Sequence, residues 1–544
     1  MILLRLCSLV TLCFAWLNGG VLSYDELKTK PKSLAKDYYI NRLINEANPS
    51  KEQVYELSKQ LYRDAGSVKK SIQKIIPPKR VVGNCAKVNS KNIIDANTTC
   101  QNALTTVAYS LKLDKTTREI LSLNLVNSHP KKSKILSALN TKNPAFALYE
   151  FGFAAEFLGY YNAISDELKT DKFSFKLSQN FMNELYKTKG FTQFLINLVM
   201  KREQDVLRSN FLLITPEITS KNDAFYLGIN AVTLGDESMA KLYFKAALNT
   251  YEFASQKDNA KFWLYLLGDD SILHELANST DINIYSLYAK EITGAEPFDV
   301  YVPRPKKQNN NEPDITNPFT WVSVANSAEK LDKEQLEAKA REFYTIDSVA
   351  AYVYFMQKAN GYKKHYYIIP ENDALNFTND IRKALIFAIA RQESLFLPAV
   401  VSTSYALGTM QFMPFLANAI GKKELKIPDF DEDHMFRPDV AYTFANHHLN
   451  YLEKYLYHPL FIAYAYNGGI GFTKRLITKD DMFKAGKYEP FLSMELVPYA
   501  ESRLYGKKVL ANYVVYRALF KNEIKISELF DALLNPQLTD NFRK

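Results

Sequence analysis

The chain has 544 residues, of which 47% are hydrophobic and 23% are charged, and its formal net charge is +9. This composition excludes an intrinsically disordered protein, and the length allows about two to four domains. The modest positive charge suits an anionic partner, but no arginine-rich run or nucleic-acid motif is present, so we expect no nucleic-acid binding. Proline (21) and glycine (19) are sparse, which favours an all-α fold over sandwich or barrel architectures.

The first 23 residues have the three-part form of a secretory signal peptide. Arg5 precedes an apolar segment, Leu6 to Leu17, that is too short to span a bilayer. We place the cleavage after Ser23, so the mature chain would be exported and would keep no integral membrane segment. A retained membrane anchor is the alternative.

Cleavage would remove Cys7 and Cys13 and would leave Cys85 and Cys100. A single pair of cysteines in an exported chain predicts a disulfide. Two buried free thiols are the alternative, and a lone pair at this spacing makes a poor zinc site.

Residues 24–301 are predicted to form one helix after another. Ser50 and Gln53 have the spacing of a capping box at the start of one helix. The stretch "DAFYLGINAVTLGDESMAKLYFKAALNTY" predicts a helical hairpin with two apolar stripes: Ala224, Leu227 and Ala231, then Ala240, Phe244 and Ala247. Because no strict period is present, we predict an irregular α-superhelix and leave open whether it closes into a ring.

The stretch "VPRPKKQNNNEPDITNP", Val302 to Pro318, interrupts the helical pattern with prolines and asparagines. We predict that residues 302–372 contain this linker and a small helical domain. Residues 373–544 are then expected to form a separate compact domain.

One carboxylate ends an apolar helix in this last domain. "NDIRKALIFAIARQES" predicts a helix that begins near Thr378 or Asn379, and its inward face has apolar residues every four positions: Ile381, Leu385 and Ile389. Four more positions lead to Glu393, so its carboxyl group is expected to lose water and to favour the neutral form, as a general acid requires. A helix-end glutamate that turns back to solvent is the alternative.

The residues after Glu393 have a recognisable order. "AIARQES" is followed by Ser402 and then by "GTMQFMP", which contains Gln411 and Met413. This order resembles the signature of the soluble lytic transglycosylases, relatives of goose-type lysozyme. The one departure in this block is Thr409, where the family usually has leucine.

Two later blocks extend the resemblance. "AYAYNGGIG" is similar to the family's Ala-Tyr-Asn-Ala-Gly loop, with Gly468 in place of the usual alanine. "ELVPYAESRLYGKKVLANYVVY" is similar to a further family block, with Ser502 in place of threonine and Gly506 in place of valine. The block retains the family's Glu501, Arg503 and Tyr505.

The resemblance implies a lysozyme-like, α-rich catalytic domain that acts on peptidoglycan glycan strands in the periplasm. It implies cleavage of the bond between N-acetylmuramic acid and N-acetylglucosamine without hydrolysis, with Glu393 first as acid and then as base. The C6 hydroxyl of the sugar would close a 1,6-anhydro ring, so we expect no cofactor, and we expect a monomer.

The same resemblance implies roles for the other motif residues. Ser402 would bind the substrate near its acetamido group, Gln411 and Tyr466 would orient the sugar and the acid, and Met413 would pack in the cleft. Asn467 would hold the loop or a sugar hydroxyl, and Glu501 would contact the glycan or its peptide. The alternatives are that Gln411 caps a helix, that Tyr466 is a core aromatic and that Glu501 only pairs with Arg503.

Metal catalysis is not expected, because His434, His447 and His448 have no metal-ligand spacing. Two rival functions remain. One is a hydrolytic muramidase that uses water. The other is a non-catalytic peptidoglycan-binding scaffold that recruits cell-wall synthesis or secretion machinery.

Overall fold

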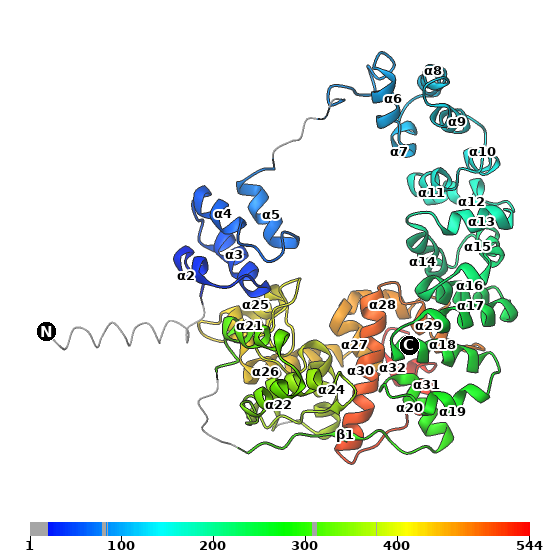
Figure 1. Cartoon of the computed structure of the whole chain (residues 1–544). Helices are drawn as coiled ribbons and strands as arrows, with labels where there is room; N and C mark the ends of the chain where they lie inside the picture. Colours follow the sequence, from blue (N-terminus) through cyan, green and yellow to red (C-terminus); the bar gives the residue numbers. More distant parts are fainter. Residues whose placement is uncertain (1–19, 79–82, 84, 307–312, 377, 544) are drawn as a thin grey trace. The chain divides into compact units, whose positions relative to one another are not determined.

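The computed structural model describes residues 20–78, 83, 85–306, 313–376 and 378–543, and it is built almost entirely of helices (Figure 1). The predicted all-α fold is confirmed. In this part of the chain the only strands are β1 (Val300–Tyr301) and β2 (His365–Tyr366), which pair in parallel. The predicted signal peptide lies in residues 1–23, of which 1–19 are outside the described residues.

The chain divides into two compact units. The first contains residues 1–78, 280–490 and 500–544, and the second contains residues 79–279 and 491–499. Residues 24–78 therefore group with the segment that carries Glu393 and not with the helices that follow them. The predicted boundaries at residues 301 and 372 stay predictions.

The elements of the first unit are α2 (Tyr24–Thr29), α3 (Leu34–Glu46), α4 (Lys51–Ser58), α5 (Gly66–Ile75), α20 (Ile284–Thr293), β1, α21 (Pro318–Ser327), η3 (Ala328–Lys330), α22 (Lys333–Arg341), α23 (Val349–Ala359), β2, η4 (Asp373–Leu375), α24 (Asp380–Ser394), α25 (Pro414–Asn418), the π-helical η5 (Ala419–Glu424), η6 (Glu432–Phe436), α26 (Pro438–Leu452), α27 (Pro459–Gly468), α28 (Ile470–Ile477), α30 (Ala500–Leu519), α31 (Ile526–Ala532) and α32 (Pro536–Thr539).

The elements of the second unit are α6 (Thr98–Leu104), α7 (Val107–Ser110), α8 (Lys115–Leu125), α9 (Pro130–Ala138), α10 (Pro144–Glu150), α11 (Ala154–Ala163), α12 (Asp166–Lys172), α13 (Gln179–Tyr186), α14 (Phe191–Lys201), α15 (Asp205–Asn210), η1 (Phe211–Leu213), η2 (Pro216–Ile218), α16 (Lys221–Thr233), α17 (Glu237–Thr250), α18 (Ala254–Leu266), α19 (Ser271–Ala277) and α29 (Phe491–Glu495).

The predicted hairpin in the second unit is confirmed as α16 and α17. All six residues of its two apolar stripes are fully buried. Asp236 ends the turn and caps α17 by accepting the amide N–H of Met239 at 3.0 Å. The helices approach closely because Gly228 has no side chain, and a Cβ there would lie 2.7 Å from the ring of Phe244.

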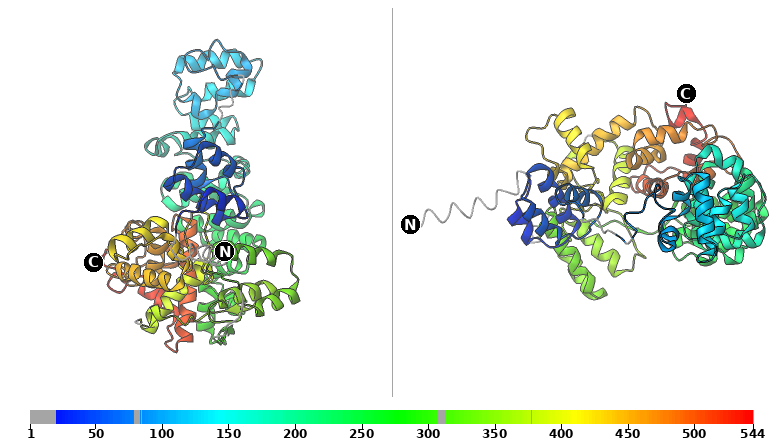
Figure 2. Two further views of the ribbon diagram at one scale, coloured as in Figure 1. Left: turned by 90° about the vertical axis from the view of Figure 1, so that its left-hand side faces the viewer. Right: turned by 90° about the horizontal axis from the view of Figure 1, so that it is seen from above.

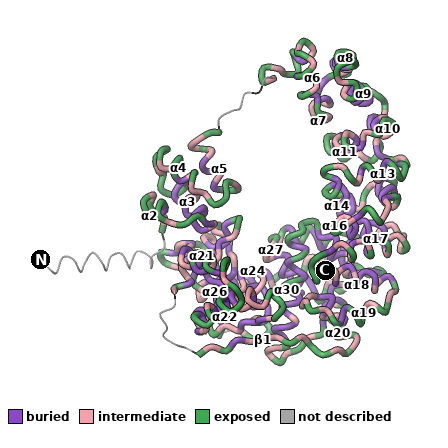
Figure 3. Tube along the Cα trace, in the orientation of Figure 1, coloured by how far each residue is buried: buried purple, intermediate pink, exposed green. Residues whose placement is uncertain are grey.

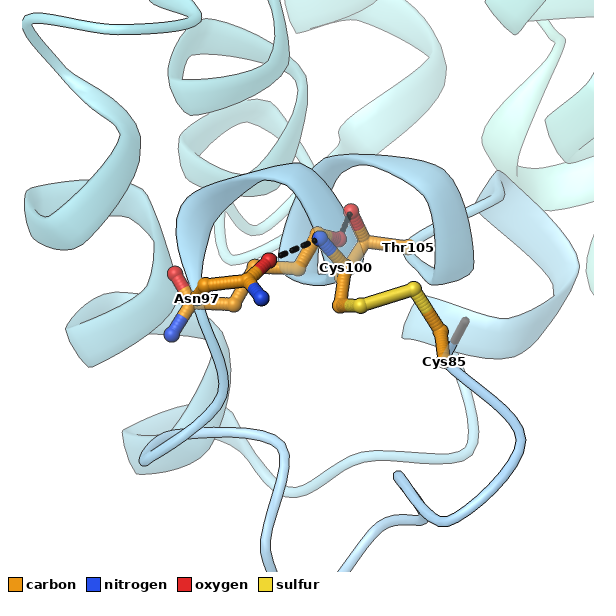
Figure 4. Close-up of a disulfide and its surroundings, with 5 residues drawn as sticks. Cys85, Asn97, Cys100 and Thr105 are labelled. Carbon is orange, nitrogen blue, oxygen red and sulfur yellow. Dashed lines mark hydrogen bonds between the residues drawn. A yellow bond between two sulfur atoms is a disulfide. The ribbon is translucent and has the colours of Figure 1, made fainter. Parts of the chain in front are cut away.

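The predicted disulfide between Cys85 and Cys100 is confirmed (Figure 4). Cys100 lies in the first turn of α6, where the Asn97 side chain caps the helix by accepting the Cys100 amide N–H at 2.9 Å. The crosslink therefore fixes a segment without regular secondary structure, residues 85–97, onto a capped helix.

In the first unit α24 packs along α30, and α27 packs along the same helix. Buried residues, purple in Figure 3, run along all three helices. Asn379 caps α24 by accepting the amide N–H of Arg382 at 2.9 Å, which confirms the predicted start. Leu385 and Ile389 are buried as predicted, but Ile381 is 46% exposed. The prediction for Ile381 was wrong because the first turn of α24 precedes the point where the helix enters the core.

The N-terminal helices α2–α5 lie beside α21 and α25 in both Figure 1 and Figure 2, and α3 contacts α21. The predicted capping box of Ser50 and Gln53 is confirmed at the start of α4. Ser23 forms a second capping box with Glu26 at the start of α2. Cleavage after Ser23 stays a prediction, and it would remove this second cap.

None of the described helices is both long enough and apolar enough to span a membrane.

We predict that replacing Cys85 and Cys100 by serine lowers the free energy of unfolding of the second unit by about 3 kcal/mol, because the crosslink closes a loop of 15 residues. Urea unfolding followed by circular dichroism measures this change. Reduction of the wild-type disulfide should give the same loss, and equal stability of the oxidised wild type and the double variant would contradict the prediction.

Candidate active site

Glu393 lies in the last turn of α24. The helix ends because Leu395 and Phe396 adopt left-handed backbone conformations, with φ of 54° and 66°. Such conformations are unfavourable for residues with a large side chain, so tertiary contacts must hold them. One such contact is a hydrogen bond from Ser394 Oγ to the carbonyl of Thr409, at 2.8 Å.

The carboxyl group of Glu393 is partly buried and accepts a hydrogen bond from Tyr505. Tyr505 Oη donates to Glu393 Oε1 at 2.7 Å. Burial raises the pKa of Glu393 to about 8, the hydrogen bond from Tyr505 opposes this shift, and the negative charge of Glu501 adds to it. Because Oε1 accepts from Tyr505, the proton of the neutral acid belongs on Oε2.

Helix α30 brings Tyr505 to Glu393 because it is tied to α24. Asn512 accepts a hydrogen bond from Arg391 Nη1 at 3.0 Å and donates to the carbonyl of Ala388 at 3.4 Å. These contacts lie on the turns of α24 that precede Glu393. The orientation of the acid therefore follows from the packing of two buried helices.

The segment after Glu393 folds into a tight loop that carries Ser402 and Gln411. Antiparallel bridges join Val401 to Leu407 and Leu407 to Phe412. Ser402 Oγ accepts the amide N–H groups of Ser404 at 3.2 Å and Ala406 at 2.9 Å. Because its oxygen only accepts in these two contacts, the Ser402 hydroxyl keeps its proton for a further acceptor.

Gln411 has a left-handed backbone, with φ of 49°, and its side chain folds back over the loop. Its Nε2 donates to the carbonyls of Val400 at 3.0 Å and Gly408 at 2.8 Å. This amide therefore does not cap a helix, which was the alternative expected from sequence. The two contacts use the donor end of the amide and leave its carbonyl oxygen as an acceptor.

Gly408 is required by a close backbone approach. Its φ is +74°, and a Cβ at this position would lie 1.9 Å from the carbonyl oxygen of Met435 in η6. No side chain fits in this space, and an L-residue would also be strained. The glycine of the "GTMQFMP" motif thus lets the loop lie directly against η6.

Tyr466, in the last turns of α27, joins the loop to the acid. Its Oη donates to the carbonyl of Met410 at 2.9 Å, and burial together with the charge of Glu393 raises its pKa well above the usual value. The Tyr466 ring is only partly buried, so it is not a simple core aromatic. The imidazole of His448 packs against this ring with centroids 5.7 Å apart, and burial lowers its pKa to about 4.

Asn467 and Glu501 form a second polar group beside Tyr466. Asn467 Oδ1 accepts from Ser502 Oγ at 2.7 Å, and its Nδ2 donates to Glu501 Oε1 at 3.4 Å. Glu501 is exposed, so its carboxylate can contact solvent or a ligand as well as Asn467.

Met413 is half-buried and precedes α25, whose first residue is Pro414. The structure thus links Glu393 to Tyr505 by a hydrogen bond and to Glu501 and Tyr466 by electrostatic interaction. Ser402, Gln411 and Met413 lie on the loop that follows Glu393 in the chain. No hydrogen bond joins these three side chains to Glu393 in the part of the chain that is described.

Of the four departures from the family motifs, Ser502 donates to Asn467 as described, and the other three have different surroundings. A Cβ on Gly506 would lie 2.2 Å from the buried ring of Tyr464, so the glycine makes room for this ring between α30 and α27. A Cβ on Gly468 would lie 2.6 Å from the ring of Phe472, so an alanine there needs the ring to move. The Thr409 hydroxyl is buried without a hydrogen-bond partner, and nothing in the structure explains it.

Tyr505 is the residue whose role sequence analysis missed. It lies in a motif block that was recognised, 112 positions after Glu393, but the spacing gives no sign that it contacts the acid. A tyrosine retained in a block of the family motif was the only available signal.

The histidines considered in the sequence analysis contact carboxylate and aromatic side chains. His447 pairs with Glu424 at 2.7 Å, and His434 packs against Phe430 with ring centroids 5.5 Å apart. Within the described ranges, no three His, Cys, Asp or Glu side chains are grouped in a way that would hold a metal ion.

Comparison with known proteins gives matches over this region. Residues 373–488 match the family model described as the transglycosylase SLT domain. The soluble lytic murein transglycosylase of Salmonella typhimurium is 29% identical over 210 residues, which cover 38% of this chain and 32% of the relative. The putative soluble lytic murein transglycosylase of Haemophilus influenzae is 30% identical over 165 residues, which cover 30% of this chain and 26% of the relative. The chain thus spans about a third or less of the length of these curated relatives.

Among solved structures, the lytic transglycosylase Slt of Pseudomonas aeruginosa aligns with a TM-score of 0.49 at 13% identity, covering 90% of this chain and 82% of that chain. The predicted resemblance to the soluble lytic transglycosylases is confirmed by the family match, which contains the first two motif blocks, whereas the block from Glu495 follows it. Residues 373–488 of this chain thus match a transglycosylase SLT domain.

Proposed function

We propose that this chain is a lytic transglycosylase of the periplasm that cleaves peptidoglycan between N-acetylmuramic acid and N-acetylglucosamine. The observation that carries the proposal is the environment of Glu393, whose pKa is raised to about 8 by burial while Tyr505 holds one carboxyl oxygen. A carboxyl group that is neutral at pH 7 and held in one orientation is suited to donate a proton to a glycosidic oxygen.

In the proposed first step the proton on Glu393 Oε2 passes to the glycosidic oxygen, and the bond between C1 and that oxygen breaks. Positive charge develops at C1, where the substrate's own acetamido group supports it. Ser402 Oγ has a proton to donate and Gln411 has a carbonyl oxygen to accept with, so both suit the amide of that acetamido group or a neighbouring hydroxyl.

In the proposed second step the C6 hydroxyl of the same sugar attacks C1 and closes the 1,6-anhydro ring. Its proton returns to the Glu393 carboxylate, so the acid is regenerated and no water is consumed. An ordinary glycosidase needs a second carboxylate as base or nucleophile. Glu501 is a described carboxylate whose charge acts on Glu393, but it is exposed and bound to Asn467, so it is a poor nucleophile for C1.

The remaining site residues have proposed supporting roles. Tyr466 would orient both the loop and the bound sugar, Asn467 and Glu501 would contact the glycan or its peptide, and Met413 would provide an apolar contact. Peptidoglycan is the proposed partner, and we propose that the chain acts as a monomer without a cofactor.

Replacement of Glu393 by glutamine tests the proposal. Digestion of purified sacculi by the wild type should release 1,6-anhydromuropeptides, which mass spectrometry identifies, whereas Glu393→Gln should lose at least about 100-fold in rate and keep binding. Glu453→Gln is the matched control, because this partly buried glutamate contacts Arg382 and none of the residues around Glu393. Products with only reducing muramic acid ends would indicate a hydrolytic muramidase, and binding without any digestion would indicate a scaffold.

The pH dependence tests the role of Tyr505. Because the acid must be protonated, the wild-type rate should fall as pH rises through about 8. Tyr505→Phe removes a hydrogen bond that lowers the pKa of Glu393, so the fall should move to higher pH while the maximal rate drops by about tenfold. Tyr516→Phe is the control in the same helix, because its hydroxyl donates to the carbonyl of Ile368 and not to Glu393. An unshifted profile in Tyr505→Phe would contradict this role.

Thermal unfolding gives a test that needs no activity. The pKa of Glu393 is raised on folding, so the folded state binds its proton more tightly and the wild type loses stability as pH rises from about 4.5 to about 8. Glu393→Gln cannot ionise, so its melting temperature relative to the wild type should increase across this range. A difference that stays constant with pH would show that the carboxyl group is not shielded from water.

A further inference from the structure

A buried charge cluster joins helix α3 to η6. Arg42 is 4% exposed and binds Asp431 through two nitrogens, with distances of 3.0 Å from Nη1 and 2.8 Å from Nη2. The same guanidinium contacts Asp433 at 3.0 Å, Glu432 at 3.4 Å and Glu46 at 3.0 Å. One arginine thus faces four carboxylates, so its removal would leave negative charges close together without a counter-ion.

Two tyrosines of α3 complete the cluster. Tyr38 Oη donates to Glu432 at 2.8 Å and to Asp433 at 3.1 Å, and Tyr39 Oη donates to Asp433 at 2.8 Å. Both tyrosines are 1% exposed. Burial raises the pKa of Asp433 to about 6, and the charge of Arg42 opposes this rise. Arg42, Tyr38 and Tyr39, which all come from α3, therefore bind the acidic turn of η6 together.

Through η6 the cluster supports residues 402–412, the loop that carries Ser402 and Gln411, which we call the catalytic loop. Met435, in the same short helix, presents the carbonyl against which Gly408 packs without room for a Cβ. Glu432 Oε2 accepts a hydrogen bond from Asn418 at 2.7 Å, which ties η6 to the end of α25. Since α25 begins directly after Met413, η6 supports both the Gly408 turn and the residue that ends the catalytic motif.

The other side of the loop is contacted directly. The ring of Tyr38 packs edge-on against Tyr405 with centroids 5.9 Å apart, and Tyr405 closes the Ser402 turn by donating its amide to the Ser402 carbonyl at 3.0 Å. Arg63 Nη1 donates to the carbonyl of Thr403 at 3.3 Å. Asp37 of α3 in turn fixes Arg63 by accepting its amide N–H at 2.8 Å.

The geometry points to α3 as a positioning element for the catalytic loop, with Arg42 as its principal positioning residue. Helix α3 sets the distance and orientation of the Ser402 and Gln411 turns relative to α24. These turns would in turn determine how the sugar fits beside Glu393. The inference on catalysis rests on the proposed function, whereas the inference on loop order does not. Glu393 itself is held by Tyr505 and α30, so the protonation of the acid is independent of Arg42.

Hydrogen exchange and kinetics on the full chain test this role together. Arg42→Ala should speed amide exchange of residues 402–412 by about tenfold, because η6, which supports the loop, loses its buried charged anchor. With glycan strands of defined length as substrate, KM should rise by about the same factor, while the fall in rate near pH 8 should stay in place. The exchange rate and KM of Arg42→Lys should lie between those of the wild type and Arg42→Ala, because lysine keeps the charge but not the planar fork.

Arg208→Ala is the matched control. Arg208 is 2% exposed and donates to Asp205 and Asn230, but it lies in α15 of the other unit. It should lower the melting temperature without changing KM or the exchange of residues 402–412. If Arg42→Ala does not fold, Tyr38→Phe removes two hydrogen bonds and keeps the ring, and it should show the same pattern to a lesser degree.

The outcomes separate the two proposals. Normal exchange and normal KM in Arg42→Ala or Tyr38→Phe would overturn the positioning role. Faster exchange in a protein whose wild type releases no anhydro product would uphold the control of loop order and would overturn the proposed function alone.

Discussion

The site depends on one contact, the hydrogen bond from Tyr505 to Glu393 within a region that water reaches poorly. Removal of water favours the neutral carboxyl, and the phenol keeps one oxygen occupied, so the shift in pKa stays moderate. With burial alone the pKa of the carboxyl group would be higher, because the hydrogen bond from Tyr505 lowers it. With full exposure it would be ionised at neutral pH. In the proposed mechanism, this balance suits a single glutamate that first gives up a proton and then takes one back.

This contact requires that α24 and α30 hold a fixed register. Arg391, two residues before the acid, donates to Asn512 and so connects the two helices. Next to Tyr505 in α30, Gly506 leaves room for the fully buried ring of Tyr464. The glycine that replaces valine in the family motif is thus part of the packing that places Tyr505. The glycine at position 506 is thus required by the size of the neighbouring Tyr464 ring, which the sequence alone does not indicate.

The sequence was sufficient for features that depend on neighbours along the chain. The helix of Glu393, its asparagine cap, the hairpin of α16 and α17 and the Cys85–Cys100 pair all follow from local spacing and composition. It was insufficient where partners are remote. The contacts from α3 to η6 join residues nearly 390 positions apart, and no sequence pattern in either segment predicts that it contacts the other. Ile381 shows a third case, because helical periodicity gives the direction of a side chain but not where the core begins.

The first unit is discontinuous, since residues 491–499 belong to the second unit and α30 follows them. Glu393 therefore leaves the ribosome well before Tyr505, Asn512 and the rest of the helix that supports it. Until residues 500–519 are made, α24 lacks the surface on which it packs, and its apolar face has no permanent cover. A nascent chain of this kind cannot form the contact between Tyr505 and Glu393 until residues 500–519 have been made, so the order of translation delays assembly of the site.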